Sequence, residues 1–130
     1  MTGRSNQESA GTISDAESVV MQVLWQRHPL AADEIIAALA PEQRWQEATI
    51  KTLLNRLLKK GAIAADQDGR RYRYSPVLQR EAWLRTQSAG LLDRLFGGRV
   101  APLVAHFSQH RKLSRKDIAE LKRLIEEMEK

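Results

Sequence analysis

The stretch ATIKTLLNRLLKKGAI, residues 48–63, constrains the fold most, because its apolar residues recur at the spacing of one helical face. At 3.6 residues per turn, one side of this helix carries Ile50, Leu53, Leu54, Leu57 and Leu58. We expect the helix to start near Gln46 and to end at Gly61, a residue typical of helix C-termini. A stripe this wide has to be buried, so other helices must pack against it.

Two shorter helices are predicted upstream. Ser14, with Glu17 three residues later, is typical of a capping box and predicts a helix over residues 15–27, closed by the turn at His28 and Pro29. The sequence AADEIIAALA predicts a second helix, with Pro41 beyond its end. Both helices have an apolar face that can cover the stripe.

A hairpin is predicted to follow the third helix. Residues 62–76, AIAADQDGRRYRYSP, alternate in polarity and contain Asp68 and Gly69, a dipeptide favoured in tight turns. Three helices and a hairpin in this order indicate a winged helix-turn-helix. We therefore expect a mainly α protein, with a small α+β winged helix-turn-helix domain over residues 13–76. The polar residues 1–12 would form a flexible N-terminal tail.

The positive charge of the chain is concentrated in this region. The formal net charge is +5, and residues 48–75 alone carry seven Lys and Arg against two Asp. The rest of the chain is therefore electrically balanced, and the excess marks a surface suited to a polyanion. The alternative is an ordinary amphipathic helix with a solvated charged face.

The polar face of the third helix has the composition of a DNA-reading helix. Small residues and Thr permit close approach to a major groove, Asn and Arg can each make two hydrogen bonds to a base edge, and Lys contacts phosphate. The predicted DNA-binding residues are Ala48, Thr49, Lys51, Thr52, Asn55, Arg56 and Lys59 on the helix and Arg70, Arg71 and Arg73 on the hairpin. Two alternatives stay open: an architectural module with little sequence preference, and a winged helix used only for protein contacts.

Residues 77–130 predict a helical dimerisation domain. A long helix over 77–96 is interrupted at Gly97 and Gly98, the apolar segment VAPLVAHF follows, and Ser114 with Asp117 begins a last helix. Such helices cannot bury their stripes alone, and a two-fold homodimer would match a palindromic operator of double-stranded DNA. The expected interface residues are Leu92, Phe96, Leu103, Phe107, Ile118, Leu121, Ile125 and Met128. A hairpin of helices within one chain is the alternative.

Several functions are disfavoured by composition. Cysteine is absent, which excludes disulfides and thiolate chemistry. His106 and His110 stand four residues apart without a third ligand, so we treat them as surface residues and expect no metal and no cofactor. The N-terminus lacks a secretory signal and no run approaches the roughly 20 apolar residues of a membrane span. We expect a cytoplasmic protein without membrane insertion that is not an enzyme.

From Ile13 onward the chain resembles the penicillinase repressor family, which includes methicillin-resistance and copper-responsive repressors. The similarity is carried by ISDAESVVMQVLW, ATIKTLLNRLLKKGAI, the FGG break and LSRKDIAELKRLIEE. The resemblance implies a dimeric repressor of a nearby gene. In the best-known members a membrane sensor protease triggers cleavage within the dimerisation domain, between Asn and Phe, and the matching place here is His106 and Phe107. The cysteine cluster of copper-responsive members is missing.

Overall fold

The computed structural model describes residues 12–110 and 112–130. They belong to two compact units, one that ends at Thr86 and one formed by Gln87–Lys130. The predicted N-terminal tail, residues 1–12, lies outside the described residues except for Thr12. The mainly α fold predicted from the sequence is confirmed, with one small sheet in the first unit.

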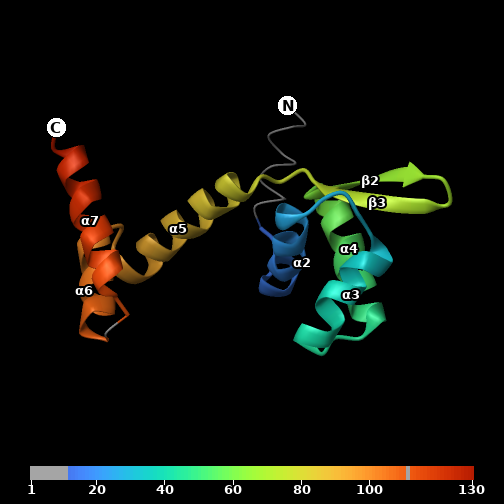
Figure 1. The fold of residues 1–130 in the computed structure, drawn as a ribbon, viewed down its shortest axis with the longest axis horizontal. Coiled ribbons are helices and arrows are strands. Elements are labelled where there is room, and N and C mark those ends of the chain that lie inside the picture. The colour runs from blue at the N-terminus through green and yellow to red at the C-terminus, as the bar shows by residue number, and fades with distance from the viewer. Residues whose placement is uncertain (1–11, 111) are drawn as a thin grey trace. The chain divides into compact units, whose positions relative to one another are not determined.

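Three helices form the body of the first unit: α2 (Asp15–Gln26), α3 (Ala32–Gln43) and α4 (Glu47–Lys60), gathered beside the hairpin in Figure 1. Their apolar faces meet in a core in which Met21, Leu24, Ile35, Leu54 and Leu57 are fully buried. The predicted stripe of α4 supplies this core, with Leu58 at its edge. As predicted, α4 ends at Gly61, whose φ of 75° is the left-handed conformation that glycine adopts readily.

The second helix is longer than predicted. We expected Pro41 to lie beyond its end, but α3 continues through this proline to Gln43 and stops where Arg44 adopts a φ of 58°. Proline lacks an N–H group, so the carbonyl of Ala37 loses its helical donor. Ala37 and Pro41 are both exposed, which leaves that carbonyl open to solvent. A proline is tolerated there because only the last turn is affected.

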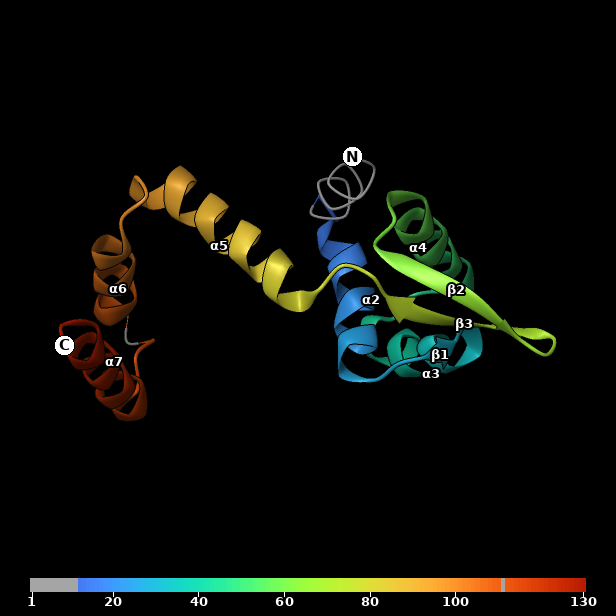
Figure 2. The ribbon, with the colours of Figure 1, turned by 90° about the horizontal axis from the view of Figure 1, so that it is seen from above.

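The sheet consists of β1 (Leu30–Ala31), β2 (Ile63–Asp68) and β3 (Arg71–Pro76). All pairs are antiparallel and β3 lies between the other two, as Figure 2 shows. Asp68 pairs with Arg71, so the hairpin loop is Gly69 and Arg70. The prediction that Asp68 and Gly69 make the turn was one residue too early. Gly69, the first residue of the loop, adopts a φ of 65°, a positive value that glycine accommodates readily at this position of a hairpin.

The chain leaves the hairpin through an anchored segment. The backbone N–H groups of Val77 and Leu78 donate to the carbonyl of Ala62 at 2.8 and 2.9 Å, and Leu78 is buried. Helix α5 (Arg80–Phe96) therefore starts after this anchor and not at residue 77 as predicted. Trp83, in its first turns, packs on Trp25 with ring centroids 5.3 Å apart. These contacts attach the start of α5 to the first unit, so the unit extends past residue 76.

The second unit contains the remainder of α5 together with α6 (Val100–Gln109) and α7 (Arg115–Met128). Ser114 and Asp117 make the predicted capping box at the start of α7, with hydrogen bonds of 3.0 and 3.2 Å. His106 and Phe107, the place that matches the cleavage site of the family's best-known members, lie inside α6. No described helix of the chain is both long enough and apolar enough to cross a bilayer.

Candidate nucleic-acid interface

The polar face of α4 is fully presented to solvent. Opposite the buried stripe, the exposed residues are Ala48, Thr49, Lys51, Thr52, Asn55, Arg56 and Lys59. The structure thus brings all seven helical residues of the predicted site onto one exposed surface, because they alternate with Ile50, Leu53, Leu54 and Leu57 at helical spacing.

The side chains on this face of α4 differ in their hydrogen bonds and ion pairs with the rest of the protein. Within the described residues, Asn55, Arg56 and Lys59 form no side-chain hydrogen bond or ion pair, so their donors are available to a ligand. Lys51 pairs with Glu47 across one helical turn at 3.1 Å. Thr52 donates from Oγ1 to the carbonyl of Ala48 at 2.9 Å, so its hydroxyl oxygen can only accept from a ligand.

Lys60 belongs to the basic segment by sequence but not to this surface. Its Nζ lies 2.6 Å from Oε1 of Glu17, a side chain that is almost completely buried. Burial raises the pKa of Glu17, but hydrogen bonds from Lys60 and Ser14 outweigh it, so the net pKa is lowered. The positive charge of Lys60 is therefore used within the fold.

Three arginines of the hairpin are placed differently. Arg70 is exposed in the loop and makes no ion pair with a described residue. Arg71 binds Asp33 through Nη2 at 2.6 Å, and Arg73 lies 3.0 Å from Asp68 through Nε. Among the three arginines of the predicted wing, Arg71 and Arg73 are paired, and Arg70 alone has no carboxylate partner within the described part of the chain.

Asp33 is the residue at this surface that sequence reasoning missed. It lies in the first turn of α3, where acidic residues are common because they favour the helix N-terminus. Its approach to Arg71 depends on the pairing of β1 with β3, which joins Ala31 to Arg73. A two-residue strand gives almost no sequence signal, so this contact could not be predicted.

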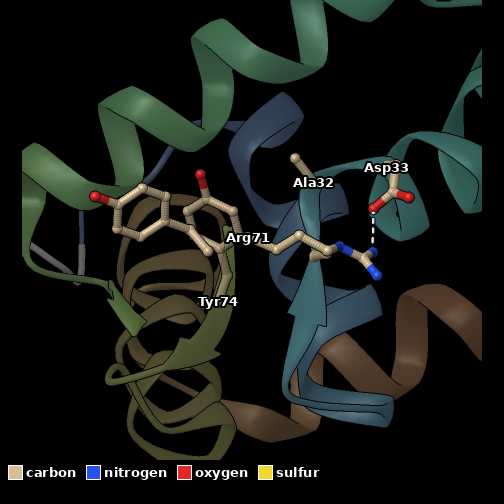
Figure 3. A pocket seen from close by; sticks show the side chains of 6 residues that line it. Ala32, Asp33, Arg71 and Tyr74 are labelled. Carbon is tan, nitrogen blue, oxygen red and sulfur yellow. Dashed lines mark hydrogen bonds and ion pairs between the residues drawn. The ribbon is translucent and has the colours of Figure 1, made fainter. Parts of the chain in front are cut away.

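A shallow groove lies beside this contact, lined by Ala31, Ala32, Asp33, Arg71, Tyr72 and Tyr74. In Figure 3 the guanidinium of Arg71 extends toward Asp33, and the Tyr74 ring lies on the other side of Arg71. Tyr74 packs its strand against the hydrophobic core of the first unit. Tyr72, two residues nearer the hairpin loop, is 55% exposed.

The predicted dimer residues lie on α5, α6 and α7. Half-buried within the single chain are Leu92, Phe96, Leu103 and Leu121, and exposed are Phe107, Ile118, Ile125 and Met128. None of the described residues of Gln87–Lys130 is buried. His106 lies near Phe96, Phe107 and His110, with ring centroids 6.2, 5.6 and 4.6 Å away. The described residues contain no group of three potential metal ligands.

Three helices, a hairpin wing and an exposed basic face on the third helix define a protein of the winged helix-turn-helix class. The chain belongs to the penicillinase repressor family, whose model matches residues 13–127. This confirms the resemblance found in the sequence. The chain is 35% identical to the penicillinase repressor of Bacillus licheniformis over 115 residues, which cover 88% of this chain and 90% of the relative.

Two solved structures are similar to this chain over 55% of its length. The solution structure of the DNA-binding domain of the repressor BlaI has a TM-score of 0.51 and 38% sequence identity, covering 55% of this chain and 87% of that one. Monomeric BlaI of Bacillus licheniformis in complex with the blaP half-operator has a TM-score of 0.50 with the same identity and coverage.

Proposed function

We propose that this protein is a transcriptional repressor that binds operator DNA with α4 in the major groove and the hairpin on the flanking backbone. The observation that carries the proposal is the exposed face of α4, on which Asn55 and Arg56 project without partners among the described residues. Family membership supports it, as does the similarity of the first unit to a repressor solved with its half-operator. We call α4 the recognition helix from here on.

Within this interface the side chains have different roles. Asn55 and Arg56 can form two hydrogen bonds with one base edge and would provide sequence specificity. Lys59, in the last turn, and Arg70, in the hairpin loop, are single cations without carboxylate partners among the described residues. They would bind phosphate, which contributes affinity for any duplex.

The active form in this proposal is a homodimer. The unit Gln87–Lys130 leaves Leu95, Val100, Ile125 and Met128 largely exposed and buries none of its described residues. A helical segment of this kind gains stability by covering its apolar surface with a second copy. Two recognition helices related by a two-fold axis would then bind a palindromic operator.

Release from DNA is proposed to follow proteolysis in this unit by a membrane sensor protease or an enzyme that it activates. The candidate bond joins His106 and Phe107 near the C-terminal end of α6. Proteases bind extended chains, so the last turn of α6 has to unwind first. Helix ends open at a low free-energy cost, and both side chains are exposed.

The test is selection of genomic fragments by the full-length protein, followed by footprinting and titration of the selected duplex. Arg56→Ala should lose operator affinity, whereas Arg85→Ala, an exposed arginine on α5, is the matched control and should not. Equal binding of selected and scrambled duplexes by the wild-type protein would contradict sequence-specific repression and favour an architectural role.

A further inference from the structure

The hairpin presents less positive charge than its sequence suggests. Arg70, Arg71 and Arg73 occupy three of four consecutive positions, and Tyr72 is the fourth. Arg73 is paired with Asp68 on the neighbouring strand, and Arg71 is paired with Asp33 of α3. For a phosphate that approaches the wing, two of the three arginines are already neutralised.

The pairing of Arg71 is built on the helix scaffold. Nη2 of Arg71 lies 2.6 Å from Oδ1 of Asp33 and 3.8 Å from Oε1 of Glu34. Oε1 of Glu34 also accepts the backbone N–H of Ala31 at 2.9 Å, so this carboxylate is fixed at the start of α3. The side chain of Asp33 is 76% exposed, and besides the hydrogen bond from Arg71, hydrogen bonds from the backbone N–H groups of Glu34 and Asp33 also lower its pKa. Asp33→Asn keeps an oxygen that can accept these bonds, so it removes the charge beside Arg71 and leaves the capping carboxylate of Glu34 in place.

The carboxylate of Asp33 competes with DNA phosphates for the guanidinium group of Arg71. When a phosphate reaches Arg71 (Figure 3), the guanidinium must leave Asp33 or share its donors between two anions that repel each other. Binding to random duplex depends mainly on phosphate contacts. It therefore loses the whole contribution of a cation that is withheld from the phosphates. On an operator, base contacts by the recognition helix fix the protein in one register, so a freed Arg71 cannot gain a phosphate by a shift along the duplex and contributes less than on random DNA.

We infer that Asp33 is a specificity-determining residue of the DNA interface, because it withholds Arg71 from non-specific phosphate contacts. The inference rests on the proposed function of the recognition helix. It assigns to α3 an electrostatic role in choosing among sequences, although Asp33 itself need not touch a base. The arginine beside Asp33 lowers the pKa of this carboxyl group below its ordinary value of 3.8.

The test measures binding of full-length protein to the selected operator duplex and to a scrambled duplex of equal length over a series of salt concentrations. Asp33→Asn should raise affinity for the scrambled duplex about 2- to 5-fold, the range of an exposed ion pair. The salt dependence of that binding should steepen by about one unit, since one more cation meets phosphate. Operator affinity should rise less, so the ratio of the two affinities falls.

Two controls test whether the effect of Asp33→Asn depends on Arg71. Asp66→Asn removes the same charge from strand β2, where Asp66 makes no ion pair with a described residue. It should change the ratio less than Asp33→Asn. In an Arg71→Ala background, Asp33→Asn should have no further effect on the ratio. Melting temperatures compared by circular dichroism show that every variant is folded.

The outcomes separate the two proposals. If the wild-type protein prefers its selected duplex but Asp33→Asn acts equally with and without Arg71, the inference is wrong and the proposed function stands. An effect no larger than that of Asp66→Asn has the same meaning. If the wild-type protein prefers no sequence at all, the proposed repressor function fails and the inference fails with it.

Discussion

Lys60, the last residue of the recognition helix, donates from Nζ to Oε1 of Glu17 in α2 over 2.6 Å. Glu17 is only 1% exposed and its Oε1 also accepts the backbone N–H of Ser14 at 2.7 Å. One carboxylate therefore caps α2 and holds the C-terminal end of the recognition helix. A buried charge with this pairing is costly to leave without its partner.

The first prediction follows from this contact. Glu17→Gln keeps the size of the side chain but leaves Lys60 without its counter-charge, and we expect the free energy of unfolding at pH 7 to fall by about 1 to 3 kcal/mol. Urea denaturation of the full chain measures the change. Glu42→Gln, on an exposed residue of α3, is the control and should change stability little.

The same substitution predicts a pH dependence. The pKa of Glu17 in the folded protein is lowered from its ordinary value of 4.5, so in acid the unfolded chain binds this proton first. The stabilisation is complete above the unfolded pKa and is lost as the pH falls through the folded pKa. The stability difference between wild type and Glu17→Gln should therefore shrink on acidification. A difference that stays constant from pH 7 to pH 3 would show that the charge is not its source.

A second prediction separates base contacts from phosphate contacts. Arg56→Ala should cost about 1 to 3 kcal/mol on the operator and less on scrambled duplex. Lys59→Ala and Arg70→Ala should weaken both duplexes equally and make the salt dependence shallower by about one unit each. Fluorescence anisotropy at several salt concentrations gives both quantities. An Arg56→Ala variant that weakens both duplexes equally would mean that Arg56 contacts only phosphate.

A third prediction concerns assembly. Leu121 lies in the middle of the apolar stripe of α7, and Leu121→Asp would place an unpaired carboxylate in the proposed subunit contact. The variant should sediment as a monomer, keep a folded first unit and bind the operator much more weakly. Ala119→Asp introduces the same charge on the opposite, exposed side of α7 and should remain dimeric. A dimeric Leu121→Asp would assign the stripe to an intrachain core.

A fourth prediction addresses release. Under induction, the protein should appear as a shorter N-terminal fragment that ends near His106, and this fragment should no longer hold the operator. Linked binding of two DNA-binding domains can raise affinity by about 10² to 10⁴. A cut in α6 would separate the domains and remove that advantage. Immunoblots with an antibody against the first unit, taken while the target gene is switched on, show the fragment. Persistence of the full-length protein alone would exclude this mechanism.

The sequence predicted those parts of the fold that depend on local pattern. The stripe of α4, the capping boxes at Ser14 and Ser114, and the glycine end at Gly61 are set by residues a few positions apart. The extension of α3 through Pro41 was missed because proline usually ends a helix. Here the proline lies in the last turn, where the carbonyl that loses its donor is open to solvent.

The candidate site was predicted in its composition but not in its electrostatics. Periodicity placed Asn55 and Arg56 on the exposed face, since a helix fixes which side each residue occupies. The partners of Arg71 and Lys60 come from α3 and α2, residues far away in the chain. Charge counted along a segment cannot show which cations are neutralised by distant carboxylates.

None of the described residues of Gln87–Lys130 is buried within one chain. If a second copy covers this unit, as proposed, the stability of the unit depends on the concentration of the protein in the cell. With the proposed pairing, the fraction of molecules with a covered C-terminal segment depends on how many copies the cell contains. Unpaired copies would expose apolar helices and would be degraded faster than paired ones. Turnover would then keep a small pool of pairs and remove the excess of single chains, so that the level of repressor is limited by its own association equilibrium.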